Sequence, residues 1–439
     1  MLSTGNTAIP IKSRNTQRKG ASMTTPSNIG RRCSIAAAIV LSLALLTACG
    51  SSGSKPAQTQ DTTQRMKLSV LDYNTDEATH NETKATLTAC AAKVNATIDY
   101  QSIPIAKLNA KILQQLATKT LPDLLMINNP DLPQFAQTGA LSDLSKLGVD
   151  SAGYYPSVLK VGKYKNVLYG LAPTVNSLEL FYNKKMLADA QVAVPTTWDE
   201  LRDAAAKLTQ GDRYGFAYSA TSGTEGTWQF IPFLWSNGGS QLKLDAPEAV
   251  EALKFYTGLA LDGSVSKSAV NWGQADVNDQ FAAGHAAMME NGPWQIPALE
   301  ATKGLDWGSV PLPAPKAGGT TITPLGGFVW TVPVTSTAHE TRAVSVLACL
   351  NSPKNQLKTA LATNRVPGSE SVARKAVQQQ PLLATITDIV ADARPLTDDS
   401  GLKWNVVNAA LSAAIQSVIT GQADATQALK TAQAAVDNG

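Results

Sequence analysis

The chain has 439 residues, enough for a large hydrophobic core and for more than one domain. Its formal net charge is +3, but residues 1–48 hold six basic residues and no acidic one, so the rest of the chain has 31 Lys and Arg against 34 Asp and Glu. This balance excludes a strongly basic protein of the kind that binds nucleic acid through its net charge.

The N-terminal segment predicts export. Two arginines precede an apolar run over residues 35–46, which is shorter than the roughly 20 residues that span a bilayer and has the length of a secretory signal. The run leads into Leu46-Thr47-Ala48-Cys49, which resembles the bacterial lipobox, so we expect residues 1–48 to be removed and Cys49 to carry lipid. Met23 would start a signal of normal length. An ordinary signal with an incidental Cys49 stays open, as does general against twin-arginine secretion.

Residues 49–66 are rich in Ser, Thr, Gln and Pro and predict a flexible tether. After the tether we expect strands at 67–73, 97–103 and 121–127 and helices at 77–94 and 105–118. This alternation predicts an α/β fold with a parallel sheet and helices on its faces. Ligands bind such sheets beyond the carboxyl ends of the strands. At these ends the sequence has Asn74, Asp76, Asn128 and Asp131.

Residues 170–201 predict a crossing from this first unit to a second one. A strand is expected at 178–182 and a short helix at 184–190. Thr197 and Glu200 have the spacing of a capping box, so another helix is expected to start there. Strand, helix, break and capped helix within about 30 residues have the size of a βα unit.

The second half of the chain also alternates between strands and helices. The expected elements are strands at 214–219, 286–289 and 328–332, and helices at 230–235, 247–261, 339–350, 353–361 and 404–436, with a further helix that ends at 277–281.

The sequence offers little that catalysis or metal binding requires. None of the three histidines has a second His or Cys at ligand spacing, so we expect no metal and no cofactor. A pair of carboxylates for glycoside hydrolysis stays open, because such pairs can be far apart in sequence. The candidates are Glu179, Glu290, Asp76 and Asp131, which could equally bind hydroxyl groups or cap helices.

Two cysteines remain in the chain after Cys49, namely Cys90 and Cys349. Outside the cytoplasm they could form a disulfide. They could also be two buried thiols that act as small hydrophobic side chains. The sequence leaves both alternatives open.

Six of the eight tryptophans lie between residues 228 and 330. Three of them, Trp235, Trp272 and Trp294, stand beside Gly, Asn or Pro in predicted loops. An indole in such a place can serve as a platform for the apolar face of a sugar ring. We assign Trp198, Trp307 and Trp330 to packing.

A series of short motifs extends across nearly all of the chain after the signal. They are Leu121-Pro122-Asp123, 139–144, 169–173, 180–187, 195–201, 281–284, Gly292-Pro293-Trp294, Pro311-Leu312-Pro313, Gly326-Gly327-Phe328 and Val366-Pro367. Together with the lipobox, this series resembles the extracellular solute-binding proteins of ABC transporters, in the carbohydrate-binding group (family 1) that includes maltose-binding protein.

The resemblance implies the two-lobed periplasmic-binding-protein-like fold (type II), with a ligand cleft between two α/β lobes and a multi-segment hinge. Residues 67–173 and 325–368 would form the N-terminal lobe, and residues 174–324 and 369–439 the C-terminal lobe. The chain would cross between the lobes near 171–176, 320–325 and 366–372.

The resemblance also implies a function without catalysis. The protein would capture a sugar or oligosaccharide and deliver it to a membrane permease, with ATP hydrolysed on a separate subunit. It would be a monomer, anchored by lipid to the outer face of the bacterial cytoplasmic membrane. A receptor for a glycerophosphodiester or another small polar solute is an alternative, although only Arg365 and Arg394 are near enough to serve a phosphate. A secreted glycoside-active enzyme is a further alternative.

Transferred to this chain, the resemblance implies a set of ligand-binding residues drawn from both lobes and from the crossings. They are Asn74, Asp76, Asn128, Asp131, Asn176, Glu179, Trp235, Asn237, Trp272, Glu290, Trp294, Gly326, Gly327, Phe328 and Arg365.

Overall fold

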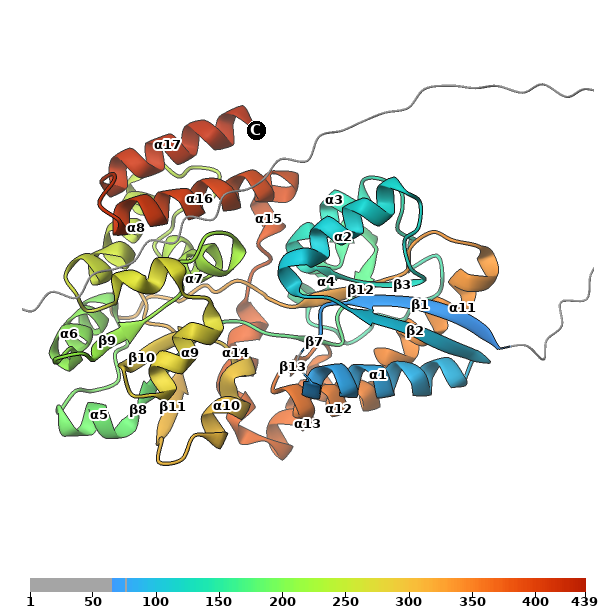
Figure 1. Ribbon diagram of the computed structural model, residues 1–439, viewed down its shortest axis with the longest axis horizontal. Coiled ribbons are helices and arrows are strands. Elements are labelled where there is room, and N and C mark those ends of the chain that lie inside the picture. Colours follow the sequence, from blue (N-terminus) through green and yellow to red (C-terminus); the bar gives the residue numbers. More distant parts are fainter. Residues whose placement is uncertain (1–64, 76) are drawn as a thin grey trace, which may run out of the picture. The chain divides into compact units, whose positions relative to one another are not determined.

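The computed structural model describes residues 65–75 and 77–439 (Figure 1). The predicted signal, Cys49 and most of the tether lie outside the described residues, and so does Asp76. Among the described residues, no helix is both long and apolar enough to cross a bilayer.

The first sheet confirms the α/β pattern expected near the N-terminus. Its strand order is β2-β1-β3-β12-β6, with β1 at Met66–Asp72, β2 at Ala96–Ser102, β3 at Leu124–Asn128, β12 at Phe328–Thr331 and β6 at Gly170–Leu171. Strands β1, β2 and β3 are parallel, and β12 runs antiparallel to β3. Helices α1 (Glu77–Ala92) and α2 (Ile105–Ala117) lie on opposite faces of this sheet (Figure 1).

The second sheet has the order β11-β8-β10-β9. Its strands are β8 at Glu179–Asn183, β9 at Tyr214–Ala217, β10 at Ala286–Asn291 and β11 at Trp307–Val310. Helix α6 (Trp198–Leu208) begins with the predicted capping box, in which the Thr197 side chain accepts from the Glu200 backbone N–H. Around this sheet lie α5 (Lys184–Asp189), α7 (Thr224–Ser236), α8 (Pro247–Leu261), α9 (Gln274–Ala282) and α10 (Ile296–Ala301).

The remaining elements connect the sheets or pack against them. They are η1 (Asn129–Asp131), α3 (Leu132–Ala136), α4 (Pro156–Val161), β4 (Lys163–Tyr164), β5 (Val167–Leu168), β7 (Thr174–Val175), η2 (Lys267–Asn271), η3 (Pro293–Gln295), α11 (Thr337–Leu350), α12 (Pro353–Thr363), β13 (Val366–Pro367), α13 (Glu370–Gln379), η4 (Pro381–Leu383), α14 (Ala384–Asp392), α15 (Thr397–Ser400), η5 (Gly401–Lys403), α16 (Trp404–Ile419) and α17 (Ala425–Asn438).

Two helix predictions need correction. The expected helix at 404–436 is two helices, α16 and α17, because Gly421 has φ +75° and the Asp424 side chain caps the second helix at the Gln427 N–H. The helix expected at 230–235 starts earlier, at Thr224, and therefore includes Trp228.

The buried side chains divide between the two sheets, with one cluster at the first sheet and two at the second. The first contains buried side chains from residues 68–175 and 325–393, and those around the second sheet come from 178–312 and 396–436. Buried side chains of residues 373–393 therefore pack with the first core. This packing favours a third crossing at 394–396, later than the 366–372 predicted from the sequence. The lobe boundaries remain a proposal.

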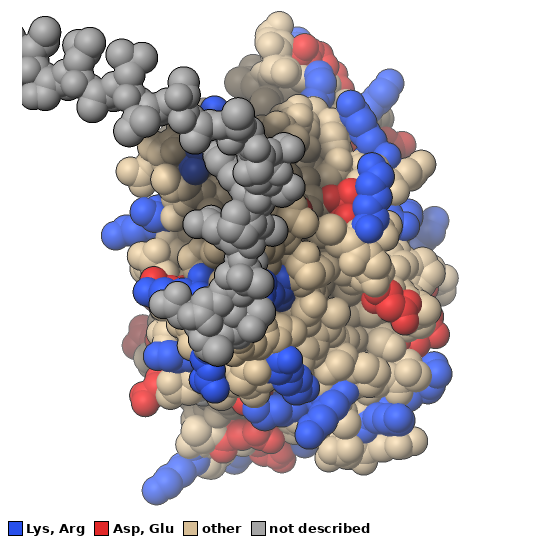
Figure 2. All heavy atoms as spheres, turned by 90° about the vertical axis from the view of Figure 1, so that its right-hand side faces the viewer, with Lys and Arg blue, Asp and Glu red and all other residues tan. Residues whose placement is uncertain are grey.

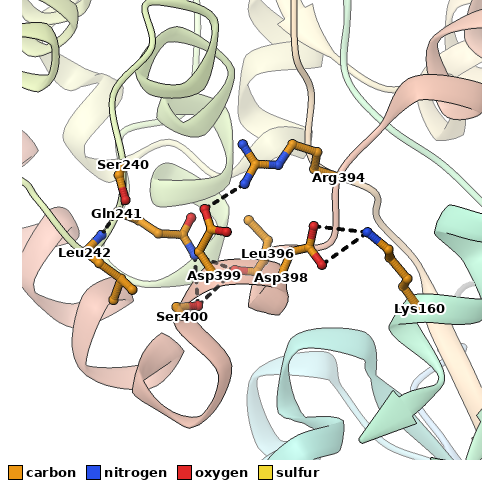
Figure 3. Close-up of polar contacts among 9 residues, drawn as sticks. All are labelled: Lys160, Ser240, Gln241, Leu242, Arg394, Leu396, Asp398, Asp399 and Ser400. Atoms are coloured by element: carbon orange, nitrogen blue, oxygen red, sulfur yellow. Dashed lines mark hydrogen bonds and ion pairs between the residues drawn. The ribbon is translucent and has the colours of Figure 1, made fainter. Parts of the chain in front are cut away.

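The three crossing segments lie side by side. Strand β7 pairs with β13, Asn176 bridges Gly326, and Pro324 bridges Arg394. Just beyond the last of these segments, Asp398 pairs with Lys160 of α4 at 3.3 Å and Asp399 accepts from Arg394 at 2.7 Å (Figure 3). The buried Gln241 side chain holds the same segment by donating to Leu396 O and Ser400 Oγ (Figure 3).

A disulfide links Cys90 on α1 to Cys349 on α11, with the two Cα atoms 5.7 Å apart. Of the two alternatives that the sequence left open, a disulfide and two buried thiols, the structure therefore has the disulfide. On the face shown in Figure 2, basic and acidic side chains are interspersed, as expected from the nearly balanced charge.

Candidate ligand-binding site

The candidate site is built around Gly326, where the second crossing passes the first. Its backbone N–H donates to Asn176 O at 2.8 Å. A Cβ on Gly326 would lie 1.8 Å from Cη2 of Trp228 and 2.2 Å from Oδ1 of Asn176, so only glycine fits here. Asn176 is 8 % exposed, and its Oδ1 has no hydrogen-bond partner among the described residues.

Two indoles form the aromatic part of this site. The rings of Trp228 on α7 and Trp294 on η3 meet edge to face, with centroids 6.4 Å apart and planes at 71°. Trp294 lies over Gly292, where a Cβ would come within 2.0 Å of the ring. Both tryptophans are half-buried, and the Trp228 Nε1 has no hydrogen-bond partner in the described chain. The arrangement offers apolar faces beside polar atoms that still need partners.

Sequence reasoning did not place Trp228 in the site. A helix that begins at residue 230 leaves Trp228 in the preceding loop, where the sequence does not predict the direction of its side chain. Gly226, two residues before Trp228, has no room for a side chain, because a Cβ there would lie 2.2 Å from the Thr221 carbonyl oxygen. The long apolar run that starts at Trp228 was the available signal.

A second aromatic pair lies at the end of the first sheet. Phe328 stacks on Tyr73 with ring centroids 3.7 Å apart. Arg365 donates from Nη2 to the Tyr73 hydroxyl at 3.4 Å, while its buried Nε has no partner among the described residues. The structure thus brings together two predicted residues, Phe328 and Arg365, through Tyr73, which the sequence analysis did not select.

Asn128 and Asp131 lie at the carboxyl end of β3, as expected for a ligand-facing edge. Asn128 is opposite Phe328 in the strand register. Burial raises the pKa of the Asp131 carboxyl to about 6, against the effect of hydrogen bonds from Asn128 and Asn109. Nearby, Gly327 has φ +120° and its carbonyl accepts from the Asn129 side chain, which holds the second crossing against η1.

Two other predicted residues are hydrogen-bonded to neighbouring elements of the protein. Asn74 is buried and donates from Nδ2 to Asp72 and Thr83. Asn237 donates from Nδ2 to Glu248 O and to Glu251, which ties α7 to α8.

Trp235 and Trp272 belong to the packing of the second lobe. Trp235 is 2 % exposed, and the guanidinium of Arg394 lies over its ring at 4.6 Å. Trp272 is half-buried between two clusters, and its carbonyl accepts from the Ser219 hydroxyl.

Glu179 and Glu290 are fully buried in the second sheet, and none of their four carboxyl oxygens has a hydrogen-bond partner in the described chain. In the antiparallel register Glu290 is opposite Leu180, so neighbouring Glu179 points to the other face of the sheet. The two carboxyls therefore do not form the facing pair that glycoside hydrolysis uses. Burial raises the pKa of Glu179 to about 8, and it raises the pKa of Glu290 well above its usual value.

Glu179→Gln is expected to stabilise the protein increasingly as pH rises. The pKa of Glu179 is raised from its usual 4.5 to about 8, so its contribution to folding is fully present below pH 4.5 and is lost as pH rises through about 8. Glutamine keeps the shape but does not ionise. The difference in Tm between variant and wild type should therefore grow from pH 4.5 to 8 and then level off. A constant difference from pH 4.5 to 8 would show that Glu179 does not titrate in this window.

Comparison with known proteins places the chain in a family. The model of the family described as "Bacterial extracellular solute-binding protein" matches residues 85–385, more than half of the chain. The chain belongs to this family. The solute-binding protein is 26% identical over 423 residues to the galactooligosaccharide-binding protein of Bacillus subtilis (strain 168), covering 92% of this chain and 96% of that one.

Solved structures confirm the expected fold. The cyclic alpha-maltosyl-1,6-maltose binding protein from Arthrobacter globiformis superposes with a TM-score of 0.72 at 23% identity, covering 85% of this chain and 100% of that chain. UgpB from Mycobacterium tuberculosis in complex with glycerophosphocholine has the same TM-score of 0.72 at 18% identity, covering 84% of this chain and 97% of that chain. Since two such different ligands occur on equally similar folds, the fold alone does not determine the ligand of this solute-binding protein.

Proposed function

We propose that this solute-binding protein captures a sugar or oligosaccharide between its two lobes and delivers it to the permease of an ABC importer. The observation that carries the proposal is the pair of half-buried indoles at Trp228 and Trp294. The apolar face of a pyranose ring packs on such aromatic surfaces, while its hydroxyl groups need hydrogen-bond partners.

Polar atoms around the indoles could serve those hydroxyl groups. Asn176 Oδ1 can accept a hydrogen bond, and Trp228 Nε1 can donate one. Asn176 Oδ1 and the Trp228 ring both lie against Gly326, so one sugar ring stacked there could use the two side chains. The name of the Bacillus subtilis relative, a galactooligosaccharide-binding protein, supports the same class of ligand.

The role proposed here is binding without turnover. The two buried glutamates, Glu179 and Glu290, point to opposite faces of their sheet, which argues against a catalytic pair. In the transport cycle the two lobes would close on the ligand, and a separate ATPase subunit would drive import by the permease. The protein would act as an exported monomer, and lipid on Cys49 would hold it at the outer face of the cytoplasmic membrane.

A glycerophosphodiester is the second candidate ligand, and Arg365 is the observation that favours it. Its buried Nε lacks a partner among the described residues, as a site for an anion would require. However, Arg394 is already bound to Asp399 and lies over Trp235. With Arg394 engaged, Arg365 is the one guanidinium of the predicted set left for a phosphate, which suits a neutral sugar better.

A thermal-shift screen tests the proposed ligand class. The purified protein is heated with mono-, di- and oligosaccharides, including galactooligosaccharides, and with glycerophosphocholine. A ligand that binds only the folded state must raise the Tm. We expect a sugar to raise it. A rise with glycerophosphocholine and with none of the sugars would replace the first candidate by the second.

A further inference from the structure

Asp72, the last residue of β1, is fully buried and accepts four hydrogen bonds. Its Oδ1 accepts from the Asn74 backbone N–H at 3.2 Å and from Ser102 Oγ at 2.6 Å. Its Oδ2 accepts from Asn74 Nδ2 at 2.7 Å and from the Tyr100 hydroxyl at 2.5 Å. Burial raises the pKa of this carboxyl, and the four donors oppose the rise.

The hydrogen-bond network around Asp72 extends to strand β2 and to helix α1. Tyr100 and Ser102 belong to β2, whose parallel register places Ser102 directly beside Asp72. Asn74 is held from the other side by Thr83 of α1 at 3.2 Å. His80, also on α1, approaches Ser102 Oγ at 3.1 Å and Asn74 O at 3.2 Å. The network therefore fixes the backbone on both sides of Tyr73.

Tyr73 is the residue between these two fixed points, and it belongs to the candidate site. Its ring stacks on Phe328, and its hydroxyl accepts from Arg365. We propose that Asp72 is a positioning residue for ligand capture, which holds Tyr73 against Phe328 and Arg365 at the ligand-facing end of the first sheet. This inference rests on the proposed ligand site, and it assigns the fully buried Asp72 no contact with the ligand.

The pattern of donors explains why a carboxylate is required at this position. Each oxygen of Asp72 takes one donor from Asn74 and one from a hydroxyl group. Hydroxyl groups can reverse and accept, but the N–H groups of Asn74 can only donate. In Asp72→Asn, whichever way the amide is turned, its NH₂ group faces one of the Asn74 donors. The backbone from Asp72 to Asn74 must then move, and Tyr73 moves with it.

The first test needs no ligand. Tyrosine-ring NMR signals of the full protein are compared in wild type, Asp72→Asn and the control Asp99→Asn, which removes an exposed carboxylate from β2. Because Tyr73 stacks on Phe328, its ring signals should be displaced from those of a free tyrosine. They should move toward the free position in Asp72→Asn only. Unchanged Tyr73 signals in Asp72→Asn would overturn the inference. If that variant does not fold, Ser102→Ala, which removes a single donor, serves in its place.

The second test measures capture with galactooligosaccharide as the probe. Asp72→Asn is expected to raise the Kd about tenfold, as for the loss of one hydrogen bond to a charged group. In a Tyr73→Ala background the same change should leave the Kd unaltered, although it still lowers the Tm. An equal loss of affinity in both backgrounds would show that Asp72 does not act through Tyr73. If wild type binds no sugar, the proposed ligand class fails, and the NMR comparison still decides the role of Asp72.

Discussion

Trp228→Ala is expected to raise the Kd for the captured sugar at least about 100-fold, a loss of roughly 2.7 kcal/mol that is typical of a central aromatic contact. The variant removes one of the two indole faces, namely the ring that lies against Gly326 and edge to face with Trp294. Isothermal titration calorimetry of variant and wild type measures the effect directly. Trp294→Ala should have an effect of similar size.

A matched control separates loss of the ligand surface from loss of packing. Trp307 packs near Phe181, with ring centroids 5.7 Å apart, away from the proposed indole pair. Trp307→Phe should lower the Tm slightly and leave the Kd within about twofold of wild type, as expected for a substitution outside the binding contact. If Trp228→Ala and Trp307→Phe change the Kd equally, the indole pair is not the ligand surface.

Removing the disulfide is expected to destabilise the first lobe by about 3–5 kcal/mol, because the bond closes a loop across a sequence separation of 259 residues and so constrains the unfolded chain. The variant is the double replacement Cys90→Ser and Cys349→Ser. Urea unfolding should show a lower midpoint for this variant than for the oxidised wild type. Since Cys90 is only 1 % exposed, reduction of the native protein should be slow without urea.

The double variant also provides its own control. Addition of a thiol reductant should lower the midpoint of wild type toward that of the variant and leave the variant unchanged. An identical midpoint in oxidised wild type and variant would mean that packing of α1 against α11, rather than the covalent bond, sustains this part of the lobe.

Local patterns in the sequence were sufficient for most of the fold. The strand and helix alternation from residue 67 onward, and the capping box at Thr197, depend on neighbours in the chain. The division of the tail at Gly421 was not foreseen, because an isolated glycine does not by itself end a helix. Whether residues 373–393 join the first or the second core depends on distant contacts, which no local pattern reveals.

The candidate site was only partly predictable for the same reason. Polar residues after a strand or helix can bind a ligand or a neighbouring element equally well, and Asn74 and Asn237 have partners at Thr83 and Glu248 that lie on other elements. Trp228 and Tyr73 were missed because their positions depend on close contact with Gly326 and Phe328, which are distant in sequence. Trp294, by contrast, follows Gly292-Pro293 and was found from that motif.

Calorimetric titration of the purified protein with galactooligosaccharide, followed by analysis of the recovered sugar, tests the central claim most directly. The account predicts saturable heat with one ligand bound per chain, the sugar recovered unchanged, and a Kd at least about 100-fold higher in Trp228→Ala. Cleaved sugar would contradict the binding role. Saturable heat with glycerophosphocholine, and none with any sugar of the thermal-shift series, would contradict the proposed ligand class.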